Sequence, residues 1–255
     1  MIDTHTHLCD PIFNIDRAIV LAKARQAGVT HIISVSETLA DVQFNLKLAE
    51  IHPELFPAAG LYPANLDLEE AERIGALIEK NVEKLVAIGE VGLDYWVVKE
   101  EEGREIQREI FRTFIDLSLE MDLPLNIHSR SAGKIVIQML LEKGAQAVHL
   151  HAFDGKASSA LPAVEAGYYF SIPPSIVRST QKQKLVRQLP LSALLLETDS
   201  PVLGVDPDAR NEPANLSIAL DAIAEIKNCA MGEVLEAVTE NTLKLYPQLK
   251  TDDNY

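Results

Sequence analysis

Two histidines separated by one residue lie near the start of the chain, in the segment His5-Thr6-His7-Leu8. Along an extended strand, alternate side chains point to the same side, so both imidazoles could contact one metal ion. The same pair could also belong to a surface N-terminus or to the remnant of an expression tag. The pair alone does not decide between a metal site and these alternatives.

Four more potential ligands occur later in the chain, mostly after apolar runs that have no other evident use for a polar group: Glu90, His128, His151 and Asp199. Imidazoles and carboxylates both bind borderline divalent ions, and a single carboxylate can bridge two of them. The six residues together therefore predict a metal site. Glu90 is the natural bridge between two ions.

A site with two ions about 3.5–4 Å apart can activate a water and hold both the attacking and the leaving oxygen. Such chemistry hydrolyses esters or phosphodiesters. Glu90 and Asp199 are the predicted catalytic residues, and Asp199 could also receive a proton from the attacking water. Alternatively, an aspartate at this place could simply cap the next helix.

The elements that must position these residues alternate along the chain. Eight strand candidates are the segment ending at His7, then 30–35, 56–60, 85–90, 125–128, 147–151, 168–171 and 193–198. Segments with helical periodicity lie between them, at 15–26, 39–51, 68–81, 105–121, 132–143 and 181–188. Two further helices are predicted at 215–226 and 231–245.

This alternation predicts the α/β fold class and a (β/α)₈ TIM barrel, with extra C-terminal helices packed outside it. An open doubly wound sheet would more often carry a Gly-rich phosphate turn after the first strand, and no such turn is present. Because no linker interrupts the pattern, residues 1–250 are predicted to form a single domain. The ligand candidates then fall at the C-terminal ends of strands, where barrel active sites lie.

Composition restricts the classes of protein further. The net charge of −15 over 255 residues argues against a broad basic face that binds nucleic acid, so an anionic substrate would need bound cations or a few local arginines. Only two cysteines, Cys9 and Cys229, occur, which fits free thiols in a reducing compartment. With no evident signal peptide or transmembrane segment, a cytoplasmic or nuclear location is expected.

The chain resembles the TatD family of metal-dependent deoxyribonucleases, a branch of the metallo-dependent hydrolases. The similarity covers most of the chain and rests on several motifs in one order: His5-Thr6-His7-Leu8, Gly89-Glu90-Val91-Gly92-Leu93-Asp94, His128-Ser129-Arg130, His151-Ala152-Phe153-Asp154-Gly155, Glu197-Thr198-Asp199-Ser200-Pro201 and Arg210-Asn211-Glu212-Pro213.

This resemblance implies a TIM barrel with two divalent ions. His5, His7 and Asp199 would serve one ion, His128 and His151 the other, and Glu90 both. It also implies hydrolysis of DNA, often from a 3′ end or at abasic or damaged sites, with Mg²⁺ expected and Zn²⁺ or Mn²⁺ as other options. No membrane or stable protein partner is expected.

The sequence departs from the family pattern at Asp154, where a small or polar residue is usual; a carboxylate there could repel a phosphate. The segment Ser171-Ile172-Pro173-Pro174-Ser175 resembles a divergent eukaryotic-type branch. A related hydrolase of a small ester, lactone or phosphomonoester is therefore the alternative function. A barrel kept only as a binding protein is a third, which the complete ligand set argues against.

Two arginines are predicted to bind substrate. Arg130 lies two residues past His128 and could hold a phosphate oxygen by a bidentate contact, or else form a salt bridge. Arg210 could reach the substrate or tie down its own loop through Glu212. Lys156 and Arg178 could add positive charge, although isolated loop cations are usually only solvated.

Other polar and aromatic residues have plainer interpretations. His149 shares strand parity with His151 and is expected to be a buried, hydrogen-bonded core residue. Asp94 is expected to organise its loop. Tyr62, Tyr95 and Trp96 could either stack on a base or close the mouth of the barrel.

Overall fold

The structure is a computed structural model that describes residues 1–250. Eight parallel strands form one sheet in the order of the sequence. The strands are β1 (Ile2–Thr6), β2 (His31–Ser34), β3 (Leu55–Ala59), β4 (Ala87–Gly92), β5 (Leu125–His128), β6 (Val148–Leu150), β7 (Tyr169–Ile172) and β8 (Leu194–Leu196). All eight predicted strands are thus present, with bounds that shift by a few residues.

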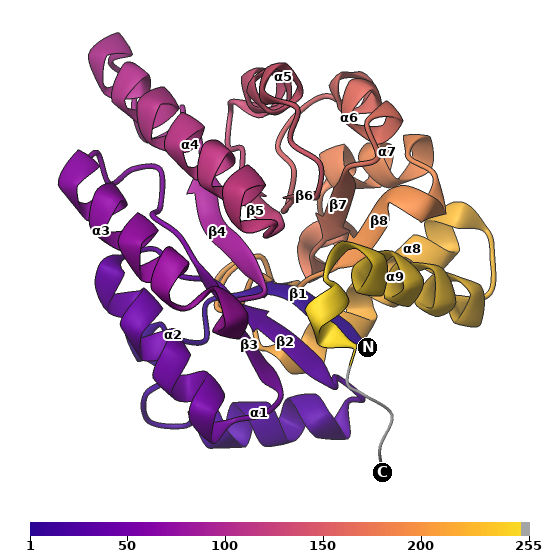
Figure 1. Ribbon diagram of the computed structural model, residues 1–255. Helices are drawn as coiled ribbons and strands as arrows, with labels where there is room; N and C mark the ends of the chain where they lie inside the picture. The colour runs from indigo at the N-terminus through magenta and orange to yellow at the C-terminus, as the bar shows by residue number, and fades with distance from the viewer. Residues whose placement is uncertain (251–255) are drawn as a thin grey trace.

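The sheet closes into a barrel between its first and last strands (Figure 1). The backbone N–H of Asp199 donates to the carbonyl of His5 at 2.9 Å, and that of His7 donates to Ser200 at 2.8 Å. The buried Asp3 carboxylate accepts from both the backbone N–H and the hydroxyl of Thr198. This closure confirms the predicted TIM barrel and joins the loop after β8 to the end of β1.

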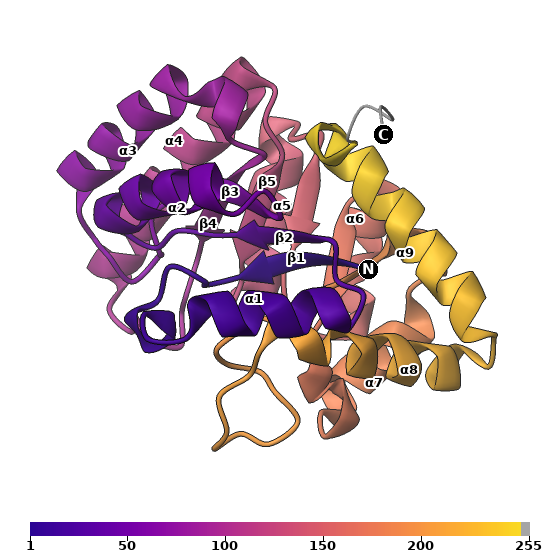
Figure 2. The same cartoon turned by 90° about the horizontal axis from the view of Figure 1, so that it is seen from below.

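The helices pack around the outside of the sheet (Figures 1 and 2). They are α1 (Arg17–Gln26), α2 (Leu39–Ile51), α3 (Leu68–Lys80), α4 (Glu101–Met121), α5 (Gly133–Lys143), α6 (Leu161–Glu165), α7 (Thr180–Gln188), α8 (Leu216–Lys227) and α9 (Met231–Leu245). The helix α6 is not among the predicted segments, because five residues are too few to show a helical period. The helix α8 follows β8 as the eighth barrel helix, and α9 is additional.

Helix ends follow local chemistry. The side chains of Thr38, Asp67 and Ser179 each accept a backbone N–H in the first turn of α2, α3 and α7. Gly144 ends α5 in the left-handed conformation, with φ of 68°. These caps determine the residues at which α2, α3 and α7 begin and at which α5 ends.

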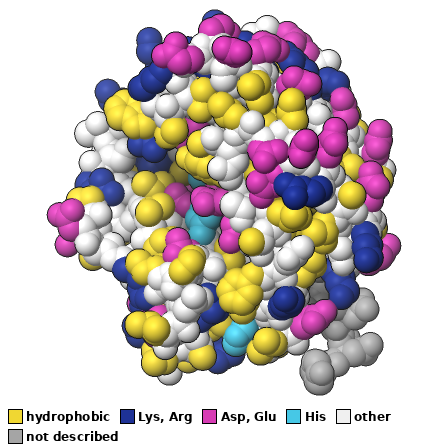
Figure 3. Space-filling view, turned by 90° about the vertical axis from the view of Figure 1, so that its left-hand side faces the viewer, with side chains coloured by type: hydrophobic (Ala, Val, Ile, Leu, Met, Phe, Trp, Pro, Cys, Tyr) yellow, Lys and Arg dark blue, Asp and Glu magenta, His cyan; other side chains and the backbone are white. Residues whose placement is uncertain are grey.

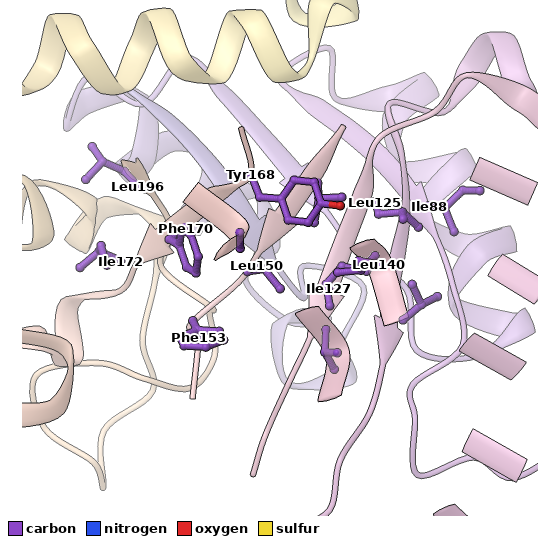
Figure 4. Packing of buried hydrophobic residues seen from close by; sticks show 14 of the residues in the cluster. Ile88, Leu125, Ile127, Leu140, Leu150, Phe153, Tyr168, Phe170, Ile172 and Leu196 are labelled. Carbon is purple, nitrogen blue, oxygen red and sulfur yellow. The ribbon is translucent and has the colours of Figure 1, made fainter. Parts of the chain in front are cut away.

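Two apolar clusters hold the barrel together. The larger lies between the sheet and the helices and includes Phe111. Figure 4 shows Phe153 and Phe170 of the same cluster. The smaller includes Ile33, Leu195 and the buried Tyr246, which follows α9. The C-terminal segment of the described chain therefore contributes to the core.

Glycine is needed where β3, β4 and β5 approach one another below the site. A Cβ at Gly60 would lie 2.5 Å from the carbonyl oxygen of Glu90, and one at Gly92 would lie 2.0 Å from that of His128. Gly92 also has φ of 143°. Larger residues at these two positions would displace the backbone that carries the site.

Within residues 1–250, no helix is both long and apolar enough to cross a membrane.

Candidate metal centre

The structure brings all six predicted ligands together at the C-terminal ends of the strands. His5, Glu90 and His128 lie on β1, β4 and β5, whereas the others follow β1, β6 and β8 directly or within a few residues: His7, His151 and Asp199. Figure 3 views the face toward which β1 and β2 point in Figure 2, and it shows a histidine with acidic side chains in a central hollow. The prediction that strand ends would place these residues together is confirmed.

One group of ligand atoms surrounds a common point beside Glu90. The Nε2 atoms of His5 and His7 are 3.2 Å apart, and they lie 3.6 and 3.4 Å from Oε2 of Glu90. The same nitrogens lie 3.6 and 3.3 Å from Oδ1 of Asp199. Around a tetrahedral ion with bonds of about 2.1 Å, ligand atoms are about 3.4 Å apart. The spacing therefore fits a shared cation.

A second group meets the other oxygen of the same carboxylate. Oε1 of Glu90 lies 2.6 Å from Nδ1 of His128 and 3.0 Å from Nε2 of His151. The two histidine nitrogens are 3.3 Å apart. The rings of His5 and His151 stack with centroids 3.7 Å apart, so the two groups adjoin. Glu90 thus presents one oxygen to each histidine pair.

Buried polar atoms without partners gather here. Within residues 1–250, only four buried side-chain polar atoms lack a hydrogen bond, and three belong to Glu90, Ser129 and His151. Such an atom costs about 1–3 kcal/mol, and more when its group is charged. The Oε2 atom of Glu90 is the one that faces His5 and His7. A cation would satisfy this oxygen, so the donor set fits a metal.

Each of the four imidazoles has an oxygen atom behind it. Asn126 Oδ1 lies 2.8 Å from Nδ1 of His5, and Asp94 Oδ2 lies 3.1 Å from Nε2 of His128. Glu37 and Glu197 lie 3.6 Å from the Nδ1 atoms of His7 and His151, respectively. In neutral His5 and His128, an acceptor within hydrogen-bond distance of one ring nitrogen keeps the proton there and leaves the other nitrogen free as a ligand. The carboxylates behind His7 and His151, at 3.6 Å, are too far away to form a hydrogen bond.

The electrostatic field of the site is strongly negative. Burial lowers the pKa of His7, but the carboxylates of Asp199 and Glu90 outweigh burial and raise it to about 9. Burial likewise opposes raised pKa values at His128 and His151, where neighbouring carboxylates prevail. Burial alone would raise the pKa of Glu90, yet the histidines hold it well below its usual range. The site therefore requires positive charge, from protons or from metal ions.

Asp199 has an unusual backbone. Its φ of 55° is in the left-handed region, which a residue other than glycine occupies at a cost of about 1–3 kcal/mol. The hydrogen bond from its N–H to His5 holds this conformation. In this conformation the carboxylate faces His5 and His7. Asp199 does not cap the next helix, because the short helix η6 (Pro213–Asn215) and α8 begin more than ten residues later.

A cavity of about 580 Å³ opens over the ligands. Its walls include Tyr62, Ser129, Arg130 and the buried Lys182, whose Nζ donates to the carbonyl of Ala152 at 3.0 Å. Burial lowers the pKa of Lys182. Lys182 and Arg130 are thus the lysine and the arginine that line this cavity.

Sequence reasoning missed several of these residues. Asn126 and Glu197 share strand parity with His128 and Asp199 and interrupt apolar runs, so alternation could have identified both. Glu37 and Lys182 lie in a loop and in the first turn of α7, and the sequence offers no comparable signal for them.

The structure does not support the prediction that Arg210 contacts the substrate. Its guanidinium binds Asp16 through two hydrogen bonds of 2.9 and 2.6 Å and Glu212 through one of 2.8 Å. It also covers the ring of Phe13 and does not line the cavity. Arg210 therefore ties the loop after β8 to the segment before α1, because two carboxylates already occupy its donors. Arg130, in contrast, does line the cavity.

The aromatic candidates have three different environments. Tyr62 donates to Asp94 at 2.8 Å and meets the His128 ring edge-on. Tyr95 is buried beneath Arg104. Trp96 is 57% exposed, with Arg130 and Lys99 against its ring. Only Trp96 among the three leaves a large aromatic surface open to solvent.

The interpretations of His149 and Asp94 are both confirmed. His149 is fully buried and contacts the hydroxyls of Tyr246 and Ser171 at 2.8 and 2.5 Å. Burial lowers its pKa well below the ordinary value. Asp94 accepts the backbone N–H groups of Trp96 and Val97 with Oδ1, while Oδ2 supports His128.

Known proteins resemble this chain along nearly its whole length. The family model described as "TatD related DNase" matches residues 2–247. "Deoxyribonuclease TATDN3" of Homo sapiens is 43% identical over 262 residues, covering 98% of this chain and 96% of that protein. The "uncharacterized metal-dependent hydrolase YabD" of Bacillus subtilis is 32% identical over 254 residues, covering 96% and 98%.

A solved structure agrees with the fold. The crystal structure of YJJV, a TatD homologue from Escherichia coli, superposes with a TM-score of 0.90 at 29% identity, covering 97% of this chain and 98% of that chain. The family match and the structural superposition agree with the barrel. The chain therefore belongs to the family of TatD-related DNases, which are hydrolytic enzymes.

Proposed function

We propose that this protein hydrolyses phosphodiester bonds of DNA with two divalent metal ions, at a 3′ end or at an abasic or damaged position. The observation that carries the proposal is the carboxylate of Glu90, whose two oxygens face separate pairs of histidines. The family match and the deoxyribonuclease names of the relatives support DNA as the substrate.

The proposed ligands fall into two groups that share Glu90. His5, His7 and Asp199 would hold one ion, and His128 and His151 the other. When bound, two such ions supply an activated water and positive charge at the attacked phosphate. Four imidazoles favour zinc-like ions by softness, whereas the family resemblance favours Mg²⁺, with Mn²⁺ as a further option.

The chain's own residues would complete the reaction. Asp199 lines the cavity and would accept the proton of the attacking water. The ammonium of Lys182 and the guanidinium of Arg130 would bind the nonbridging oxygens of the phosphate. Trp96 lies against Arg130 at the rim, where an exposed ring can stack on a base.

The cavity geometry suits an opened strand. A duplex keeps its phosphates on the outside and its bases stacked, whereas the ligands here lie at the base of a hollow. A frayed 3′ end or an abasic position lets the backbone enter at a smaller cost in unstacking. Asp154, the departure noted in the sequence, accepts the Ser131 N–H at 2.9 Å. Its charge is thus tied to a neighbouring loop.

The experiment is a substrate panel with purified protein and added Mg²⁺, Mn²⁺ or Zn²⁺. We expect cleavage of single-stranded, 3′-recessed or abasic DNA by the wild type and a loss of at least about 100-fold in Glu90→Ala. The matched control is Glu54→Ala, which should keep the activity of the wild type. Glu54 is a buried glutamate just before β3 that forms an ion pair with Arg25 of α1. Hydrolysis of lactones, carboxylic esters or phosphomonoesters without DNA cleavage would overturn the proposal.

A further inference from the structure

A second groove adjoins the cavity over the ligands. Its volume is about 680 Å³, and it lies between the loop after β6 and helix α7. Asp154 and Gln181 line both hollows, so the groove and the cavity share a wall. We call it the α7 groove, defined by Asp154, Lys156, Gln181, Lys184 and Arg187.

The charge of the α7 groove is opposite to that of the whole chain. The net charge of the protein is −15, yet this groove has three cationic residues and one acidic residue. Lys156, Lys184 and Arg187 are all exposed, and none forms an ion pair with any residue in 1–250. By contrast, Arg108 and Arg210 elsewhere on the surface are each bound to two carboxylates.

The cations of the groove converge because of helix geometry. Lys184 and Arg187 are three residues apart on α7, which places them on one face of the helix. Lys156 faces them from the loop after β6, and it directly precedes the short helix η3 (Ala157–Ala160), which packs against α7. The three positive charges therefore line one hollow.

The walls of the groove are fixed before any ligand binds. The side-chain amide of Gln181 donates to the carbonyl oxygens of Gly155 at 2.7 Å and Phe153 at 3.3 Å, which joins α7 to the opposite loop. Asp154 is held by the N–H of Ser131. A preformed groove loses little conformational entropy when a ligand enters it.

We infer that the α7 groove binds the sugar–phosphate backbone of the DNA strand next to the phosphate held in the cavity. This inference rests on the proposed function. A polyanion that leaves the cavity past Asp154 and Gln181 enters this cationic hollow directly. Lysine and arginine contacts to phosphates bind without regard to sequence and release counterions. The groove would thus favour oligonucleotides over single nucleotides.

The test is the triple variant Lys156→Ala/Lys184→Ala/Arg187→Ala, studied by fluorescence anisotropy with metal-loaded protein and a labelled single-stranded hexanucleotide that has hydrolysis-resistant phosphorothioate linkages. Because the contacts are electrostatic, the expected loss of affinity is about tenfold, and the slope of log K against log salt should fall by roughly 2. All three side chains are exposed, so the variant should keep the melting temperature of the wild type.

A matched control removes three exposed lysines of α2, α3 and α9 that form no ion pair with any residue in 1–250: Lys47→Ala/Lys80→Ala/Lys244→Ala. It should keep the affinity and salt slope of the wild type. In the wild type, affinity should rise from a dinucleotide to the hexanucleotide, and the groove variant should lose that rise. In activity assays with metal, the groove variant should have a higher KM than the wild type for the ordinary phosphodiester hexanucleotide. Its hydrolysis of bis(4-nitrophenyl) phosphate should be unchanged.

Equal affinity and salt slope for the wild type and the groove variant would overturn the inference, as would an equal loss in the control. Because the anisotropy measurement needs no catalysis, it is separate from the proposed function. If DNA binding depends on the groove but no DNA is cleaved, only the proposed function is contradicted. If DNA is cleaved but its binding does not depend on the groove, only this inference is contradicted.

Discussion

The amide oxygen of Asn126 lies 2.8 Å from Nδ1 of His5, while its amide nitrogen donates to the carbonyl of Thr4 at 3.0 Å. The second contact fixes which way the amide points, so Nδ1 of His5 must be the donor. In the neutral imidazole, Nε2 of His5 is then the nitrogen with a free lone pair, and it faces Glu90 and Asp199. A residue of β5 thereby prepares a ligand on β1.

Asn126→Ala should weaken metal binding by roughly 10–100-fold, because the ring of His5 loses the partner that fixes its tautomer. Competition with a chromophoric chelator would measure the change. Asn241→Ala is the matched control. Asn241 is also a buried asparagine, but its side-chain amide donates hydrogen bonds to the backbone carbonyls of Leu191 and Leu194. If both variants bind metal as the wild type does, the role assigned to Asn126 is wrong.

Metal affinity should rise as the pH rises toward about 9. The carboxylates raise the pKa of His7 to about 9 against the effect of burial, and a proton on that imidazole competes with an ion. In the metal-free protein, protonated His7 stabilises the fold below pH 6.5, and this contribution is lost as the pH passes about 9.

Isothermal titration at pH 7 in two buffers of different ionisation enthalpy would count the protons released on metal binding. At least one proton should be released by the wild type, and fewer by His7→Gln. A metal affinity that is constant between pH 6.5 and 9 would refute this account of His7.

Lys182→Met should lower kcat/KM for DNA by about 100-fold without reducing metal content, because a buried cation that binds phosphate oxygens is removed while its apolar stem is kept. Lys182→Arg should restore part of the loss. Steady-state kinetics with metal analysis of each variant would check both. Wild-type kinetics in metal-loaded Lys182→Met would show that Lys182 only supports Ala152.

Trp96→Ala should raise KM for single-stranded DNA by about five- to 160-fold, because stacking on an aromatic ring contributes about 1–3 kcal/mol per base. Arg130→Ala should act in the same direction. Arg210→Ala is the comparison: it should lower the melting temperature, since it breaks three hydrogen bonds to Asp16 and Glu212, and leave KM unchanged. An unchanged KM in Trp96→Ala would exclude stacking.

The strands and the ligands could be predicted from the sequence because both leave a local signal. An apolar run that ends in a histidine or a carboxylate marks the end of a barrel strand, as in Ala87-Ile88-Gly89-Glu90. The residues that orient the ligands left weaker signals. Asn126 is a single polar residue within the apolar run of β5. Glu37 lies in a loop whose path depends on the closed barrel.

The error at Arg210 has the same cause. Its partner Asp16 is 194 residues away in the sequence, and only barrel closure brings the two together. The sequence analysis names Lys156 as a possible source of positive charge but does not predict that Lys156 converges with Lys184 and Arg187, because the loop after β6 and helix α7 are separate elements. Long-range pairing of this kind follows from the folded topology and leaves no periodic pattern.

The most direct test of the central claim is electron paramagnetic resonance of the protein titrated with Mn²⁺. If Glu90 bridges two ions, two equivalents should bind and give an exchange-coupled spectrum, which Glu90→Gln should lose. A spectrum of isolated Mn²⁺ at every stoichiometry, or a coupled spectrum that persists in Glu90→Gln, would contradict the shared site.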